Sequence, residues 1–369
     1  MSRLDRRLPT LDATACTVLS GGGRCREGAA MEVESRDGAQ RAFTGPLPEW
    51  SEVESLVEAA YRRYKGDPGG VVADYIPVLA RADPNWFAVS VVETSGDAHC
   101  AGDVDVEFSI QSISKAFVYA LVCETYGHNA VADRIGVNNT GLPFNSVIAI
   151  ELNDGHPMNP MVNAGAIATT ALMPGSTPDE QWEHIASGLS AFAGRPLEVD
   201  ETVYRSEAET NHRNRAIARL LESYGRIELD PLDVVDVYTR QCSLRVTATD
   251  LAVMGATLAD GGVNPVTGQR VVSAGVCRDT LAILAANGAY ERSGEWLFEI
   301  GLPGKSGVAG GLITVAPGKA GIGTFSPPLD EAGNSVRGQR ATAYLSRVLG
   351  LNIFASHAHT LAARGKDQT

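Results

Sequence analysis

Short strand-like runs occur near both ends of this 369-residue chain, and a long helical stretch separates them. These runs, rich in β-branched and aromatic residues or bounded by Pro and Gly, are 87–92, 104–108, 297–302, 310–316 and 321–325. Because strands need partners, the two groups are expected to pair with each other across the intervening sequence. The pattern predicts an α+β fold built on a mixed or antiparallel sheet.

Helices are expected on both sides of that sheet. Apolar residues recur at helical spacing over 53–61 and 336–349, so terminal helices should flank the sheet, and 127–296 reads as an all-helical lobe. The expected divisions are a loosely ordered extension at 1–46, a functional domain at 47–356, its sheet subdomain at 47–126 and 297–350, and a tail at 357–369. A site is expected in the cleft between sheet and lobe.

The charge balance narrows the possible partners. A formal net charge of -13 argues against nucleic acid or an anionic membrane, because neither attracts an acidic surface. With 44% hydrophobic residues the chain has material for a sizeable core.

No segment is long and apolar enough to be expected to cross a bilayer. The run 164–173 reaches only about half the required length and is expected to be a buried helix. Arg3, Arg6 and Arg7 imitate the start of a signal peptide, but Pro9 and Asp12 interrupt the apolar run that a signal peptide needs. The expected location is the cytoplasm.

Cysteine and histidine spacing gives no metal or disulfide signature. The six cysteines contain no C-x-x-C pair, which is typical of reduced thiols, and the seven histidines form no H-E-x-x-H element. His357-x-His359 is the one local pair that could ligate a metal, and alone it is a weak signal. We expect neither a metal nor another cofactor.

The stretch S-I-Q-S-I-S-K at 109–115 carries the first chemical signal. Only five of the 31 basic residues are lysine, and a buried lysine can lose its proton whereas arginine cannot. Ser112 and Lys115 are three apart, so at the start of a helix running to about residue 126 they share one face, and the amine can take the hydroxyl proton. The alternative is a capped, solvated helix start. Ser109 and Ser114 lie off this face and are interpreted as packing or cap residues.

A second lysine motif, G-K-S-G-V-A-G-G, spans 304–311. It is not a phosphate loop, because Glu299 stands where that loop needs glycine and Pro303 removes a backbone donor. Lys305 and Gly307 instead match the K-[ST]-G element of S-x-x-K serine enzymes. Glycine on an edge strand lets a substrate approach, and the Val308 amide can form an oxyanion hole with the Ser112 amide.

Together with these motifs, longer strings give the chain a family resemblance. They are D-Y-I-P at 74–77, P-M-N-P-M-V-N-A-G-A-I at 157–167, S-E at 206–207, R-N-R-A-I-A at 213–218, Y-T-R-Q-C-S at 238–243, G-L-P-G-K-S-G-V-A-G-G at 301–311 and F-S-P-P-L-D-E-A-G-N-S-V-R-G at 325–338. Over roughly 47–355 the sequence resembles the serine-dependent glutaminases, which share the fold of serine β-lactamases and penicillin-binding transpeptidases.

The resemblance implies an activity and a set of site residues. It implies hydrolysis of L-glutamine to L-glutamate and ammonia, without a cofactor, by a homodimer or homotetramer. Ser112 would be the nucleophile and Lys115 its base, and Tyr290 or Tyr75 would pass a proton to the departing ammonia. The implied substrate pocket consists of Tyr75, Ser112, Asn163, Glu207, Asn214, Tyr238, Tyr290 and the Val308 main chain, with Lys305 and Gly307 in support.

The chemistry of an amino-acid ligand agrees with this set. Its ammonium needs an anion, which Glu207 can supply, and its carboxylate needs neutral donors such as Asn and Tyr. The alternative for Glu207 is a place in a helix N-terminal turn, suggested by Ser206-x-x-Glu209.

Two other functions stay open at this point. One is a β-lactamase or D-Ala carboxypeptidase relative, although no S-x-N or Y-x-N element lies between the two lysine motifs. The other is a non-catalytic amino-acid binder or filament-forming scaffold that keeps the pocket, and the presence of Ser112, Lys115 and Lys305 argues against it.

Overall fold

The structure, a computed structural model, describes residue 45 and residues 47–356. The expected extension, apart from residue 45, and the expected tail with its His357-x-His359 pair lie outside the described residues. No helix of the described part is long and apolar enough to cross a membrane.

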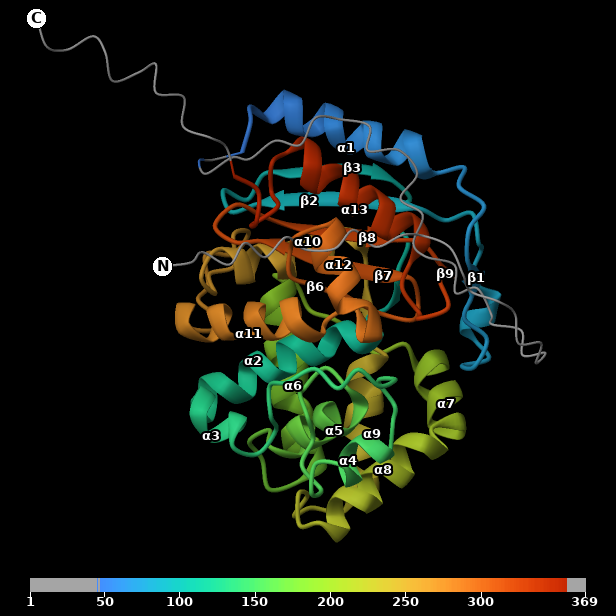
Figure 1. The fold of residues 1–369 in the computed structure, drawn as a ribbon, viewed down its shortest axis with the longest axis vertical. Coiled ribbons are helices and arrows are strands. Elements are labelled where there is room, and N and C mark those ends of the chain that lie inside the picture. The colour runs from blue at the N-terminus through green and yellow to red at the C-terminus, as the bar shows by residue number, and fades with distance from the viewer. Residues whose placement is uncertain (1–44, 46, 357–369) are drawn as a thin grey trace, which may run out of the picture. The chain divides into compact units, whose positions relative to one another are not determined.

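A five-stranded antiparallel sheet joins the two ends of the described chain (Figure 1). Its strand order is β3-β2-β8-β7-β6. The strands are β2 (Ala88–Glu93), β3 (Ala98–Gly102), β6 (Gly304–Ser306), β7 (Gly311–Ala316) and β8 (Ala320–Phe325). Because β2 pairs with β8 from Ala88↔Phe325 to Glu93↔Ala320, the expected pairing between the two groups of strands is confirmed.

Two helices cover one face of the sheet, α1 (Trp50–Tyr64) and α13 (Val336–Val348), which lie side by side in Figure 1. Val53, Val57 and Ala60 recur at helical spacing on α1 and are fully buried against strand residues such as Val89 and Ile322. This layer confirms the flanking terminal helices.

The other face of the sheet packs on α10 (Ala248–Ala259). Glycines on β8 permit the close contact: a Cβ on Gly321 would lie 2.1 Å from Ala252 O, and one on Gly323 would lie 2.0 Å from Ala248 O. Helix and strand thus meet backbone to backbone. α10 therefore packs on the sheet although it falls within the interval expected to be the helical lobe.

Helices dominate 127–296 as expected. They are α3 (His128–Ala132), α4 (Ile148–Glu151), α5 (Asn163–Ala171), α6 (Pro178–Ala193), α7 (Glu201–Thr210), α8 (His212–Ser223), α9 (Pro231–Cys242), α10, α11 (Ala274–Asn287) and α12 (Ser293–Glu299), with a 3-10 turn η3 (Tyr290–Arg292). Of these, α3, α5, α6 and α11 pack against α2 (Ser114–Tyr126), which a 3-10 turn η2 (Gln111–Ile113) precedes. Minor elements are η1 (Leu79–Arg81) and the two-stranded pairs β1 (Val71–Val72) with β9 (Pro328–Leu329) and β4 (Phe108–Ser109) with β5 (Arg245–Val246).

Two strand predictions are wrong. Residues 104–107 are irregular, and the second strand is β3, because a tight turn at Gly96 with φ 95° returns the chain at once to pair with β2. The predicted run 297–302 begins inside α12 and ends in an irregular segment. Ile300 and Leu302 are fully buried there, so their apolar character reflects core packing.

Candidate active site

Ser112 lies in the turn that opens α2. It belongs to η2 and is 9% exposed, at the wall of a cavity. Gln111, directly before it, has φ 50°, a conformation that non-glycine residues seldom adopt and that is often kept at functional sites. Ser114 Oγ donates to Gln111 O at 2.8 Å and holds the turn. The interpretation of Ser114 as a local structural residue agrees with this contact.

Lys115 is buried in the first turn of α2, with 1% of its surface exposed. Its Nζ donates to Asn163 Oδ1 at 2.7 Å and to Met161 O at 3.2 Å. Burial lowers the pKa of the amine to about 8, and the negative charge of Glu207 is among the smaller, opposing influences. A solvated helix start is therefore excluded for this residue.

Asn163 connects this lysine to α8. Its Oδ1 accepts from Lys115, and its Nδ2 donates to Asn214 Oδ1 at 2.9 Å. Both asparagines are buried and both line the cavity. The amide of Asn163 is thereby fixed in orientation, since each end has its own partner.

Glu207 is a buried carboxyl on the wall of the same cavity. It is 7% exposed, and Gln111 Nε2 donates to its Oε2 at 3.3 Å. Burial raises its pKa to about 7, although the bond from Gln111 and the charge of Lys115 oppose this shift. The suggested cap at Ser206 is wrong, because α7 begins at Glu201 and Asp200 caps it by accepting from two backbone amides.

The second lysine motif lies against the Ser112 turn. β6 is an edge strand that packs on η2, and a Cβ on Gly307 would lie 3.0 Å from Ile110 O. Lys305 is fully buried; its Nζ donates to Ser306 O at 2.9 Å and lies 4.1 Å from the centre of the Tyr290 ring. Burial, and then repulsion by Lys115, hold its pKa well below the usual range.

The two amides expected to form an oxyanion hole are available. Gly307 N donates to Gly311 O at 2.9 Å, which fixes the turn after β6. Neither Ser112 N nor Val308 N donates to a protein acceptor among residues 45 and 47–356. Both therefore have an N–H group to offer to a ligand.

The tyrosines occupy different positions. Tyr290 is buried with φ 57°, donates from its hydroxyl to Ser306 O at 3.1 Å, and has a pKa raised by burial and lowered in part by a hydrogen bond with Ser112. Tyr238 is buried on α9, and Tyr75, 56% exposed, stands at the cavity wall. Tyr290 is thus the phenol that interacts with the serine.

These side chains surround a cavity of about 220 Å³. The expected residues on its wall are Tyr75, Ser112, Asn163, Glu207, Asn214 and Tyr238, whereas Lys115, Tyr290, Lys305, Gly307 and Val308 lie outside that wall. Gln111, Phe144, Asn211 and Arg213 also line it and were not predicted. Gln111 had one available signal, its position directly before Ser112.

Comparison with known proteins places these features in a family. A profile of the Glutaminase family matches residues 70–354. "Glutaminase 2" of Yersinia pestis is 55% identical over 317 residues, 86% of this chain and 93% of that protein. A glutaminase of Brucella canis is 52% identical over 288 residues, 78% of this chain and 91% of that protein.

Solved structures agree. A structure described as probable glutaminase ybaS is similar with a TM-score of 0.83 and 47% identity, covering 84% of this chain and 100% of that chain. The structure of Mglu in its glutamate form is similar with a TM-score of 0.79 and 39% identity, covering 83% of this chain and 70% of that chain.

Proposed function

The chain belongs to the glutaminase family, and from this premise we propose how its residues hydrolyse L-glutamine to L-glutamate and ammonia. Ser112 is the nucleophile and Lys115 the base of an acyl-enzyme mechanism. The observation that carries the proposal is a serine on the wall of a polar cavity, three residues before a buried lysine of lowered pKa.

Substrate recognition rests on the charged ends of the amino acid. Glu207 accepts the α-ammonium, and Asn214, Tyr238 and Tyr75 are available to the α-carboxylate. Burial raises the pKa of the Glu207 carboxyl to about 7, so near neutral pH both of its forms are populated. The positive charge of the incoming ammonium then favours the ionised form. This arrangement selects a zwitterion.

Acylation begins with the neutral form of Lys115. A neutral amine has two N–H donors and one lone pair. The donors remain on Met161 O and Asn163 Oδ1, and the lone pair takes the proton from Ser112 Oγ. Oγ then attacks the side-chain amide carbon, and the developing oxyanion accepts from the Ser112 and Val308 amides.

Ammonia leaves with that proton. Lys115 returns it through the hydroxyl of Tyr290, which interacts with Ser112, and the C–N bond breaks. Tyr75 is the less direct choice for this step. Water next attacks the glutamyl ester, and the same groups transfer the protons in the reverse direction. This step frees L-glutamate and restores the Ser112 hydroxyl.

Lys305 and Gly307 support this chemistry without touching the amide. Burial and then repulsion by Lys115 lower the pKa of Lys305, which favours a neutral Lys305 amine beside the proposed site. Gly307 lets the Val308 amide approach the Ser112 turn, because any side chain there would meet Ile110 O.

The test is a coupled assay of glutamate and ammonia with matched serine variants. Ser112→Ala should lose about four orders of magnitude or more in kcat. Ser109→Ala, a change in the same stretch, should retain turnover because Ser109 Oγ only accepts a bond from Gln111. Turnover surviving in Ser112→Ala would exclude the mechanism.

Assembly and location complete the proposal. We infer a homodimer or homotetramer in the cytoplasm; the family resemblance supports the assembly, and the free cysteines at 100, 123, 242 and 277, which are typical of a reducing compartment, support the location. Light scattering on the full chain tests the assembly, and a monomer at assay concentration contradicts it. Fractionation of the producing cells tests the location.

A further inference from the structure

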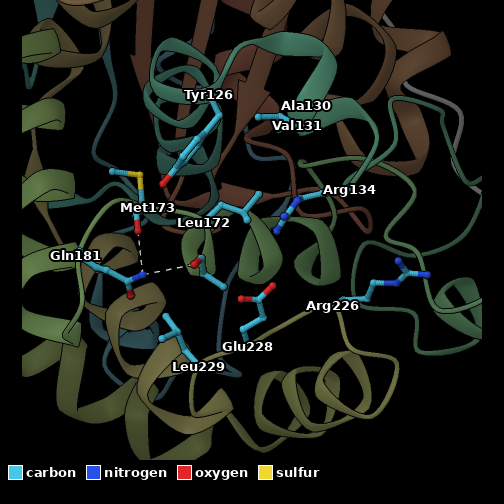
Figure 2. A pocket seen from close by; sticks show the side chains of 12 residues that line it. Tyr126, Ala130, Val131, Arg134, Leu172, Met173, Gln181, Arg226, Glu228 and Leu229 are labelled. Atoms are coloured by element: carbon cyan, nitrogen blue, oxygen red, sulfur yellow. Dashed lines mark hydrogen bonds between the residues drawn. The ribbon is translucent and has the colours of Figure 1, made fainter.

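A second cavity, of about 370 Å³, lies in the helical part of the chain and shares no wall residue with the Ser112 cavity (Figure 2). Its wall comes from the end of α2 at Tyr126, from α3, from the end of α5 at Ala171, from Gln181 of α6, and from the segment 226–229. Nothing in the proposed reaction uses it.

Four helices run between the two cavities. α2 starts beside Ser112 and ends at Tyr126, and α5 starts at Asn163 and ends at Ala171. α8 and α9 carry Asn214 and Tyr238 near the first cavity, and the segment that joins them forms part of the second. Each helix thus has one end at each site.

Gln181 presents an unused acceptor in the second cavity. It is 2% exposed, and its Nε2 donates to Met173 O at 3.0 Å and to Ala171 O at 3.4 Å, as the dashed lines in Figure 2 mark. Both N–H groups are occupied by carbonyls, so the amide orientation is fixed. Its Oε1 accepts no hydrogen bond from the described residues.

Charged side chains of both signs stand on the same wall. Arg226 Nε is buried without an acceptor in the described part of the chain, whereas its Nη2 donates to Asp154 O at 3.4 Å. Neither Arg134 nor Glu228 forms an ion pair among the described residues. An adjoining cavity of about 170 Å³ shares these three residues and Leu172, which places the charges where the two hollows meet.

The rest of the wall is apolar or aromatic. Val131, Leu172, Leu229 and Met173 line it with the ring of Tyr126, and Figure 2 shows Leu172 between Tyr126 and the charged side chains. The wall therefore offers two cations and an anion, an apolar middle, and one amide oxygen.

We propose that this cavity binds a small amphipathic zwitterion of the aromatic amino-acid class. Its carboxylate faces Arg134, its ammonium faces Glu228, its ring fills the apolar middle, and a donor on the ring meets Gln181 Oε1. Because four helices end at both sites, its binding changes the KM for L-glutamine; this consequence alone rests on the proposed function.

Titration calorimetry with L-tryptophan on the full chain tests the site without relying on turnover. L-Phenylalanine, which lacks the ring donor, and indole-3-propanoate, which lacks the ammonium, should each bind about tenfold more weakly. Glu228→Gln and Arg134→Met should weaken L-tryptophan binding by a similar factor.

The decisive variant is a substitution that fills the cavity. Ala130→Trp adds an indole to the wall and should abolish binding, whereas Asn129→Trp on the same helix, outside the wall, should retain it. Turnover should survive in both variants, which shows that they fold. No binding of L-tryptophan to the unaltered chain, or equal binding to Ala130→Trp, overturns the proposal.

Discussion

Burial shifts the pKa values of two ionisable groups near the Ser112 cavity, Lys115 and Glu207, in opposite directions. Burial lowers the pKa of the amine to about 8 and raises the pKa of the carboxyl to about 7. The proposed reaction needs the amine neutral and the carboxyl ionised, and both forms gain population as pH rises. Desolvation therefore favours the neutral amine that the proposed base needs, but it disfavours the ionised carboxyl that the proposed binding of the substrate ammonium needs.

The pH profile of kcat/KM follows from these two values. The account predicts a steep fall below about pH 7, with a slope near two in logarithmic form, and a slope near one between about 7 and 8. Glu207→Gln removes one titrating group. The kcat/KM of this variant should be much lower at every pH, and its logarithm should rise with a slope near one only. A profile that rises toward acid pH in the native enzyme would contradict both roles.

Thermal stability should respond to the same carboxyl. The pKa of Glu207 rises from an ordinary value of 4.5, so folding favours its protonated form, and the fold loses stability as pH rises through about 5 to 7. Glu207→Gln should therefore raise the stability at pH 8 on the order of 1 kcal/mol, or about 2 °C in Tm. At pH 4.5 the difference should shrink. Equal destabilisation at both pH values would contradict the argument.

At the scale of elements, the site depends on how β6 meets the turn η2. Gly307 lies where a Cβ would be 3.0 Å from Ile110 O and 3.3 Å from the Ile113 side chain. A methyl group there pushes the Val308 amide away from the Ser112 amide. The proposed oxyanion hole thus depends on a glycine at position 307.

Gly307→Ala should lower kcat about a hundredfold, with a smaller effect on KM, because the displaced amide acts mainly in the transition state. The control is Gly275→Ala on α11, where a Cβ meets nothing within 4 Å. Steady-state kinetics of both variants measure the effect. A native kcat in Gly307→Ala would remove the Val308 amide from the mechanism.

Sequence patterns predicted elements best where the signal was local. α1 and α13 followed from apolar spacing, and the helix that begins at the Ser112–Lys115 motif followed from the apolar run after it; the catalytic roles of the two residues stay predictions. β3 was missed because its place depends on a hairpin turn, since Ala98–Gly102 has little β propensity of its own. The buried run that ends at Leu302 looked like a strand because core packing and strand formation favour the same side chains.

At the scale of the whole described chain, the site is assembled from distant segments. Gln111 and Glu207, joined by one hydrogen bond, are 96 residues apart, and β2 pairs with β8 across the entire helical part. Contacts between such distant residues leave no local signal in the sequence. The hydrogen bond between Gln111 and Glu207 and the second cavity were therefore not predictable. Glu207, Asn163 and Asn214 were named only through the family resemblance.

The proposed functional domain, 47–356, gives a prediction at this scale. A chain beginning at residue 47 and ending at 356 keeps every element of the sheet and every residue of the proposed mechanism. It should retain kcat and KM within about twofold and unfold in one transition. Calorimetric melting and steady-state kinetics measure this, and loss of activity in a folded truncated chain would assign a role to the removed segments.

The most direct test of the central claim is to find the covalent intermediate. Rapid acid quench of the enzyme with L-glutamine, followed by proteolysis and mass spectrometry, should place a glutamyl ester on Ser112, and Ser112→Ala should yield none. Cys242 also lines the cavity, but burial raises the pKa of its thiol to about 12 and leaves it a poor nucleophile. A glutamyl thioester on Cys242, or a glutamyl adduct that persists in Ser112→Ala, would contradict the account.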